Sequence, residues 1–320
     1  MFRFLQKFGR DSQTRRRGTG SLTRARRRNH QLNCEALEGR QLLSGYYIVN
    51  QASGKVLDNS LSTVDGTVID QWQLYGGTNQ QWNLVPQANG TDEIQNAQSG
   101  MALTATSGSE GTQIVQVPWL GGYLAQEWTV SLGAGQVGNG NSVNVGFKNA
   151  YSGMWLDNPQ SSQSNGTPTI QWPLDYGANQ QWTLLAADPS FSPETMCINN
   201  TANGDPLLGE FTFWTVVPLA DGYDLFVNAS TGEVLDDPDF STSDGGIQQY
   251  QLNGGLNQQW QQSDAGSIDG VEAGIVICNA YSGLVLDDPT GNPTSQIQDQ
   301  ELGLPSLTQC WEISYSYPAY

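Results

Sequence analysis

The sequence Asn79-Gln80-Gln81-Trp82 recurs as Asn179-Gln180-Gln181-Trp182 and as Asn257-Gln258-Gln259-Trp260. Shorter versions that keep only the Gln and the Trp are Gln126-Glu127-Trp128 and Gln309-Cys310-Trp311. A Gln-x-Trp signature that returns at intervals of about 50 residues indicates an internal repeat. The longest interval, 78 residues between the third and fourth Trp, is long enough to contain a sixth, degraded copy.

Each copy begins well before its Trp. A turn of Ser or Thr with Gly, followed after two residues by Leu-Asp, occupies residues 53–58, 152–157, 231–236 and 282–287. The copy that ends at Trp128 has the same turn at residues 99–104, but Thr104 replaces the Asp. An aromatic residue stands seven positions before the Asn in the three full copies, as Trp72, Trp172 or Tyr250. Turn residues that separate short apolar runs predict a repeat built of short strands.

The repeats predict an all-β fold. Copies one to three span residues 46–87, 92–132 and 143–186, and copies four and five span 223–264 and 274–314. Residues 189–222 have a repeat opening and a repeat end, but the central hairpin between them is missing. A single unit cannot bury its apolar face, whereas three units can close on one another. We therefore expect two tandem β-trefoils, at 46–188 and 189–320, of which the second has a shortened first unit.

Charge is divided unevenly along the chain. Residues 1–44 contain eleven of the thirteen Lys and Arg, whereas residues 45–320 contain two lysines against 28 acids. An acidic body repels nucleic acid and anionic membrane surfaces, so neither is an expected partner. No stretch approaches the ~20 apolar residues that a membrane-spanning helix needs, which predicts no membrane insertion. The sequence leaves the oligomeric state open.

Residues 1–45 are expected to be a basic, disordered targeting leader. The segment Leu37-Glu38-Gly39-Arg40-Gln41-Leu42-Leu43-Ser44 resembles the Leu-Glu-x-Arg-x-Leu-Leu-Ser leader of secreted and surface proteins of planctomycete bacteria. This resemblance implies a secreted or cell-surface location.

Three of the four cysteines follow the leader. Among these three, Cys197 and Cys278 stand near matching positions of their repeats and are the pair to test first for a disulfide. The alternative is that all three cysteines are small buried residues.

The repeat contains the residue types that bind sugars. Adjacent sugar hydroxyls need a carboxylate or an amide, and the C–H face of a sugar ring suits the face of an aromatic ring. Five Gln-x-Trp copies, with Leu-Asp and the aromatic residue in register, resemble the repeats of ricin-type lectins. The resemblance implies that the Asp, the aromatic residue and the Asn contact the sugar, and that the first Gln supports the Asp. The three sites implied are site 1 (Asp58, Trp72, Asn79, Gln80), site 2 (Asp157, Trp172, Asn179, Gln180) and site 3 (Asp236, Tyr250, Asn257, Gln258).

Other positions of the repeat are assigned structural roles. We expect the five repeat tryptophans to lie in the core, because a trefoil buries one large residue per unit at that position. Copy two, which has Thr104 and Val117 in place of acid and ring, and copy five, which has Thr308 in place of the Asn, are predicted not to bind sugar. Relatives often prefer galactose, and many of them have a Gln two residues before the aromatic residue. Asp70 and Ile170 replace that Gln here and Gln248 keeps it, so galactose-type sugars stay one possibility.

The sequence predicts a binding protein that is not an enzyme. The only histidine, His30, belongs to the leader, and no His or Cys spacing indicates a metal site or another cofactor. Carboxylate pairs can hydrolyse glycosides, but 28 acids make their presence uninformative, and no segment is left over for a catalytic domain. The expected partners are glycans or polysaccharides, bound multivalently by shallow pockets. The alternative is a structural or adhesive surface protein that keeps the trefoil without binding sugar.

Overall fold

A computed structural model of the protein describes residues 45–137, 143–188, 194–209, 212–238, 245–268, 271–288, 298–300 and 306–314. Their secondary structure consists of short strands and single turns of 3-10 helix. No helix in these ranges is long and apolar enough to cross a membrane. The predicted leader lies outside the described residues, except for Gly45. The 3-10 turns are Thr78–Gln80, Leu124–Gln126, Pro159–Ser161, Ala178–Gln180, Leu256–Gln258 and Leu307–Gln309.

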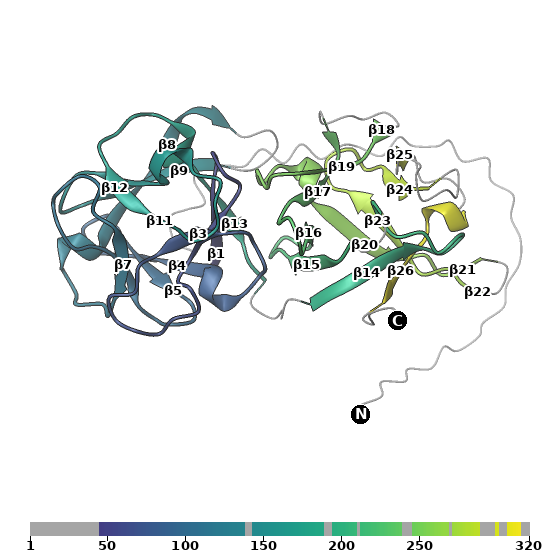
Figure 1. Ribbon diagram of the computed structural model, residues 1–320, viewed down its shortest axis with the longest axis horizontal. Helices are drawn as coiled ribbons and strands as arrows, with labels where there is room; N and C mark the ends of the chain where they lie inside the picture. Colours follow the sequence, from purple (N-terminus) through teal and green to yellow (C-terminus); the bar gives the residue numbers. More distant parts are fainter. Residues whose placement is uncertain are drawn as a thin grey trace, which may run out of the picture. The chain divides into compact units, whose positions relative to one another are not determined.

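The first sheet closes on itself. Strands β1, β4, β5, β8, β9 and β13 form a ring in which each strand pairs with the next, and β13 returns to β1. Hairpins β2–β3, β6–β7 and β10–β12 extend from this ring (Figure 1). The strands are β1 (Tyr46–Asn50), β2 (Val56–Asp58), β3 (Asp70–Trp72), β4 (Gln81–Pro86), β5 (Asp92–Asn96), β6 (Ala102–Ala105), β7 (Ile114–Val117), β8 (Glu127–Val137), β9 (Val143–Asn149), β10 (Trp155–Asp157), β11 (Thr167–Pro168), β12 (Ile170–Trp172) and β13 (Trp182–Ala186).

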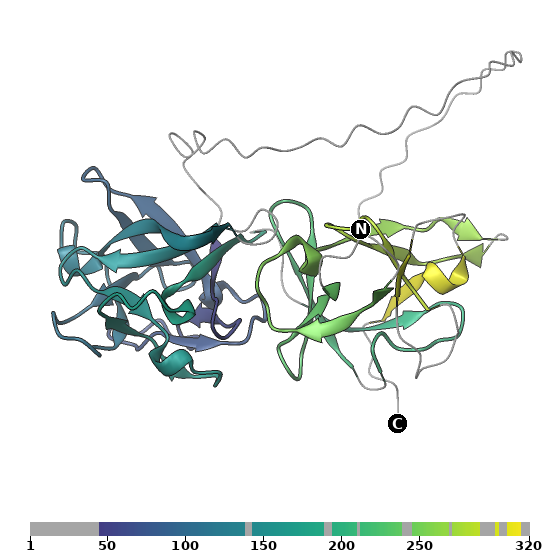
Figure 2. The same ribbon diagram turned by 90° about the horizontal axis from the view of Figure 1, so that it is seen from above.

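The second sheet repeats this ring with β14, β15, β16, β20, β23 and β26. Within the described residues it has two hairpins, β17–β19 and β24–β25, whose strands are labelled in Figure 1. Figure 2 shows the strands of this sheet coloured from teal-green to yellow. The protein therefore consists of two tandem β-trefoils, as predicted. The strands are β14 (Glu194–Asn200), β15 (Trp214–Pro218), β16 (Asp224–Asn228), β17 (Val234–Asp236), β18 (Gly245–Gly246), β19 (Gln248–Tyr250), β20 (Trp260–Asp264), β21 (Ser267–Ile268), β22 (Val271–Glu272), β23 (Ile275–Asn279), β24 (Val285–Asp287), β25 (Gln298–Gln300) and β26 (Trp311–Ser314).

The third hairpin of the second trefoil is replaced by a short connection. Between β14 and β15, the described residues contain no strand and only the isolated bridge of Asn199 with Pro206. Trp214 nevertheless lies at 0% exposure in the second core. Its Nε1 donates to the carbonyl oxygen of Leu207 at 3.4 Å. Residues 189–222 are therefore a sixth repeat unit that has lost its hairpin and kept its core residue.

Six buried tryptophans form the centres of the two cores. The five in the Gln-x-Trp signatures are also 0% exposed, which confirms their predicted core role. Each indole N–H donates to the carbonyl of the Leu in its own Leu-Asp or Leu-Thr pair, which supplies the partner that a buried N–H needs. These bonds join Trp82 to Leu57, Trp128 to Leu103, Trp182 to Leu156, Trp260 to Leu235 and Trp311 to Leu286, at 2.9 to 3.2 Å.

The hairpins of the first trefoil are fixed by a cyclic set of glutamines. The Nε2 of Gln71, in repeat one, donates to two carbonyls in the loop of repeat three, those of Ser162 and Ser164, at 2.7 and 3.2 Å. Gln116 binds the loop of repeat one in the same way, and Gln171 binds the loop of repeat two. Because Trp72 and Trp172 directly follow two of these glutamines, the same bonds hold the exposed aromatic residues in place.

An apolar cluster contains side chains from both sheets. Tyr47, Val49 and Val56 of the first sheet belong to the same buried cluster as Leu225 and Val227 of the second. Both trefoils lie within one unit of the chain, Gly39–Tyr320. Residues 46–188 and 189–320 as separate domains stay a prediction.

The disulfide between Cys197 and Cys278 is not formed. Both residues are free cysteines, as is Cys310. Cys197 lies on β14 opposite Ser314, and Cys278 lies on β23 opposite Gln261. Strand β26 stands between β14 and β23 in the sheet, so the matching positions of the two repeats are not neighbours.

Candidate functional site

Strand register brings the acid and the ring of each site to one face of a hairpin. Val56 pairs with Trp72, Leu57 with Gln71 and Asp58 with Asp70. Directly paired residues project from the same face, and successive residues alternate between faces. Asp58 and Trp72 therefore share one face, while Leu57 points into the core. The same register places Asp157 on one hairpin face with Trp172, and Asp236 on one hairpin face with Tyr250.

The rings are partly exposed, whereas the acids on the same hairpin faces are buried. Trp72, Trp172 and Tyr250 are 39%, 38% and 47% exposed. The three site aspartates are each only 2% exposed. An exposed aromatic ring that shares a hairpin face with a carboxylate is an arrangement that can contact both the apolar and the hydroxyl side of a sugar.

An Asn and a Gln from each 3-10 turn hold the carboxylate. In site 2, Asn179 Nδ2 and Gln180 Nε2 both donate to Asp157 Oδ2 at 2.8 Å. Amide donors of this kind provide the hydrogen bonds that a buried acid requires. Sites 1 and 3 repeat these contacts at 2.8 to 3.0 Å, so each set of predicted site residues is brought together.

A glycine makes room for the Asn in sites 1 and 2. Gly77 and Gly177 have extended backbone conformations, with φ of −64° and −74°, which any residue can adopt. A Cβ atom at Gly177 would nevertheless overlap Asn179 Oδ1, and one at Gly77 would overlap Asn79 Oδ1. The side chain, not the backbone, therefore requires glycine at these positions.

Substitution of Gly177 by alanine is expected to displace the Asn179 side chain from Asp157 and Asp175. Overpacking of this kind costs about 1 to 3 kcal/mol of stability. Chemical denaturation measures the loss, and the NMR signals of the Asn179 side-chain amide report the displacement. Gly108→Ala is the matched control, because its Cβ would meet Tyr151 Cε1 at an ordinary 3.6 Å. Equal stability of the two variants would contradict the close approach at Gly177.

The three sites differ at the residue four positions before the Asn. Site 1 has Tyr75, whose hydroxyl donates to Asp58 Oδ2 at 2.9 Å and accepts from Asn79 Nδ2 at 2.7 Å. Ser60 N donates to Asp58 Oδ1 at 2.6 Å. With the bonds from Asn79 and Gln80, each oxygen of Asp58 has two donors. The Tyr75 hydroxyl thus stands where a sugar hydroxyl would donate.

Site 2 has an acid at this position. Asp175 Oδ1 accepts from Gly177 N at 2.8 Å, and Asp175 Oδ2 accepts from Asn179 Nδ2 at 3.2 Å. Asp157 Oδ1 has no donor within the described residues. Burial, opposed by the hydrogen bond from Gln180 and reinforced by the negative charge of Asp175, raises the pKa of Asp157 to about 6. Site 2 is therefore the one in which a carboxylate oxygen is left for a ligand.

Site 3 has Asn253, whose Oδ1 accepts from Gly255 N at 2.7 Å. Its Asp236 also accepts from Gln248 Nε2, at 2.9 Å, across the hairpin. The position of Gln248 is filled by Asp70 in site 1, where burial raises the pKa of the carboxyl to about 6. Tyr75 and Asp175 are site residues that the sequence pattern did not predict, although both stand four positions before the Asn of their repeat.

Copies two and five keep the hydrogen bond from the Gln to the residue after Leu, but they lack other residues of the full site. Gln126 Nε2 donates to Thr104 Oγ1 at 3.3 Å, so a hydroxyl replaces the carboxylate in copy two. Gln309 Nε2 donates to Asp287 Oδ2 at 3.1 Å in copy five, where Thr308 replaces the Asn. The absence of sugar binding by these copies stays a prediction.

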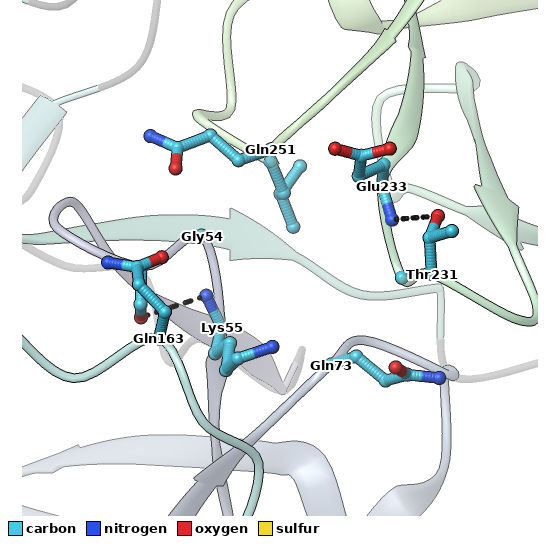
Figure 3. Close-up of a pocket in the computed structure, with 10 residues that line it drawn as sticks. Gly54, Lys55, Gln73, Gln163, Thr231, Glu233 and Gln251 are labelled. Carbon is cyan, nitrogen blue, oxygen red and sulfur yellow. Dashed lines mark hydrogen bonds between the residues drawn. The ribbon is translucent and has the colours of Figure 1, made fainter.

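A polar pocket of about 190 Å³ lies apart from the three sites (Figure 3). Lys55, Gln73, Gln163, Glu233 and Gln251 are among the residues that line it. None of the predicted site residues does so, and no aromatic side chain is present in its lining. Within the described ranges, no group of three or more His, Cys, Asp or Glu side chains is placed to hold a metal ion.

The fold and the three polar sites define a protein class, the β-trefoils that carry candidate ligand sites at equivalent places of several repeats. A model of the family described as ricin-type beta-trefoil lectin domain-like matches residues 35–117, 124–208 and 212–300. Because these matches cover more than half of the sequence, the protein belongs to this family. The comparison with curated proteins finds no match.

Several solved structures are similar to part of the chain. ThreeFoil, a designed protein with threefold symmetry, is 35% identical over 44% of this chain and 96% of its own, with a TM-score of 0.40. An exo-β-1,3-galactanase from Clostridium thermocellum is 31% identical over 45% of this chain, which spans only 30% of the galactanase (TM-score 0.41). The Macrolepiota procera ricin B-like lectin, solved with lactose, is 26% identical over 45% of this chain and 98% of its own (TM-score 0.37).

Proposed function

We propose that this protein is a lectin that binds glycans without catalysis. The observation that carries the proposal is an exposed ring on the same hairpin face as a buried, amide-held aspartate, which occurs three times at equivalent places of the repeat. A few polar contacts and one stacked ring per site imply weak binding by each site alone, in the millimolar range. Several sites on one chain raise the avidity for a polymeric glycan without new contacts.

Site 2 is the principal site in this proposal. Its Asp157 Oδ1 has no donor within the described part of the chain, whereas the Tyr75 hydroxyl already occupies the equivalent carboxylate in site 1. A sugar entering site 1 has to displace this hydroxyl, which makes binding weaker there. Galactose-type sugars, which many relatives prefer, are one ligand class to test.

A secreted or cell-surface location is also part of the proposal, and the resemblance of residues 37–44 to a secretion leader supports it.

A glycan array with the full-length chain tests the function. We expect binding to a defined group of glycans, and a loss of at least about tenfold in affinity in the triple variant with Asp58, Asp157 and Asp236 changed to alanine. Removal of a buried carboxylate leaves its amide partners unpaired, which costs about 1 to 3 kcal/mol of stability. Circular dichroism therefore accompanies the array to show that the variant is folded.

Ring variants separate binding from stability. Trp172→Ala removes a surface ring and is expected to weaken binding with little effect on unfolding. Tyr123→Ala is the matched control, because Tyr123 is also exposed, at 44%, and belongs to copy two. A triple variant that retains the array profile of the wild type would show that the assigned sites are wrong. Absence of glycan binding by the wild type would favour the structural or adhesive alternative.

A further inference from the structure

Site 2 places two carboxylates on one amide. Asp157 Oδ2 and Asp175 Oδ2 both accept from the same Asn179 Nδ2, at 2.8 and 3.2 Å, so the two acids lie close together. The exposed Trp172 ring shares the hairpin face of Asp157. Lys148 lies opposite Trp155 on the neighbouring strand and is not bonded to either acid in the described chain. The site therefore has negative charge without a basic partner.

The buried acid has an unused oxygen. Asp157 is 2% exposed, and its Oδ1 has no donor among the described residues. An ionised carboxylate in such surroundings gains from a further donor and from a positive charge, because burial and the negative charge of Asp175 both raise its pKa. A ligand that brings an ammonium group supplies the two together.

The other two sites do not share this charge arrangement. Site 3 has the neutral Asn253 in place of Asp175, and its turn to Gly255 matches that of Asp175 to Gly177. Site 1 has a second acid, Asp70, but both oxygens of its Asp58 are already filled by donors that include the Tyr75 hydroxyl. Asp70 Oδ1 is also without a partner among the described residues, but it is fully buried. Among the three sites, an unfilled oxygen on the aspartate of the Leu-Asp pair beside a second acid is thus specific to site 2.

We propose that site 2 selects glycans that carry a free amino group, such as glucosamine residues, over their neutral or N-acetylated counterparts. The ammonium donates to Asp157 Oδ1 and Asp175, in charge-assisted hydrogen bonds that are about twice as strong as neutral ones. The Trp172 face receives the C–H side of the sugar and attracts the same positive charge. The inference rests on the proposed glycan-binding function and specifies the ligand class of one site.

Two disaccharides with the same backbone test the selectivity. The probes are the glucosamine disaccharide with free amines and its fully N-acetylated form, titrated calorimetrically into the full-length chain near neutral pH. We expect the free-amine form to bind about tenfold more tightly, with an advantage that shrinks as salt is added. Asp175→Asn is expected to abolish this preference and to preserve the fold, since Asn253 already makes the same turn in site 3.

A control variant tests whether the preference comes from a general attraction of the ammonium group to the acidic protein. Asp65→Asn makes the same change of charge at an exposed loop position and is expected to leave the preference unchanged. Equal reductions in the Asp65 and Asp175 variants would overturn the proposal, as would equal affinity of the wild type for both disaccharides or binding of neither. The glycan array tests the lectin function separately. A protein that binds glycans on the array but shows no preference for the free-amine disaccharide would contradict only the amino-sugar proposal.

Discussion

Replacement of Trp182 by alanine is expected to lower the free energy of unfolding by about 3 to 5 kcal/mol. The side chain is 0% exposed and packs in one core with Trp82 and Trp128. Truncation removes the largest apolar group of its repeat and leaves a cavity that the neighbouring strands cannot fill. It also leaves the carbonyl of Leu156, which accepts from the indole at 3.2 Å, without this donor. Urea unfolding followed by circular dichroism measures the change.

Two further tryptophans serve as comparisons. Trp172→Ala is expected to cost less than about 1 kcal/mol, because this ring is 38% exposed. Trp214→Ala is expected to be as severe as Trp182→Ala, because Trp214 is fully buried although its repeat has lost the hairpin. If Trp214→Ala unfolds like Trp172→Ala, the degraded unit does not contribute to the second core in the way described here.

The fold could be predicted because its determinants recur in the sequence. Trp82, Trp182 and Trp260 follow their Leu-Asp pairs by 24 or 25 residues, and this constant separation lets each indole reach the preceding Leu carbonyl. The degraded unit kept its opening and its end in the sequence, so its missing hairpin was predicted as well. Cys197 and Cys278, the pair to test first for a disulfide, are free cysteines, because equivalent positions of their two repeats are separated by β26.

The site could be predicted only in outline. Alternation along a strand is enough to place Asp58 and Trp72 on one face of a hairpin. Whether a neighbouring side chain already donates to the carboxylate depends instead on the direction in which that side chain points, and no periodicity of the sequence determines this direction. Tyr75 and Asp175 occupy the same place in their repeats, yet one donates to the site acid and the other adds a second charge beside it. This difference depends on side-chain positions, which the sequence pattern does not determine.

Acidification is expected to stabilise the fold. The pKa of Asp157 and that of Asp70 are each raised to about 6, chiefly by burial. A carboxyl whose pKa is higher in the folded protein than in the unfolded chain favours folding in its protonated form. Its stabilising contribution is complete below the unfolded value near 3.8 and is lost as the pH rises through about 6. We expect the free energy of unfolding to increase by about 1 to 2 kcal/mol between neutral pH and about pH 5.

Glycan affinity at site 2 is expected to change in the opposite direction over the same pH range. The ligand needs the ionised form of Asp157, so affinity falls about tenfold for each pH unit below the pKa of this group. Calorimetric titration at several pH values, paired with urea unfolding at the same values, measures both quantities. Asp157→Asn removes the titrating group. It is expected to flatten the affinity profile near pH 6 and to reduce the change in stability to the part that Asp70 contributes. General acid unfolding lowers stability and affinity together, so a parallel fall of the two would contradict the assignment of Asp157 as the ligand-binding acid.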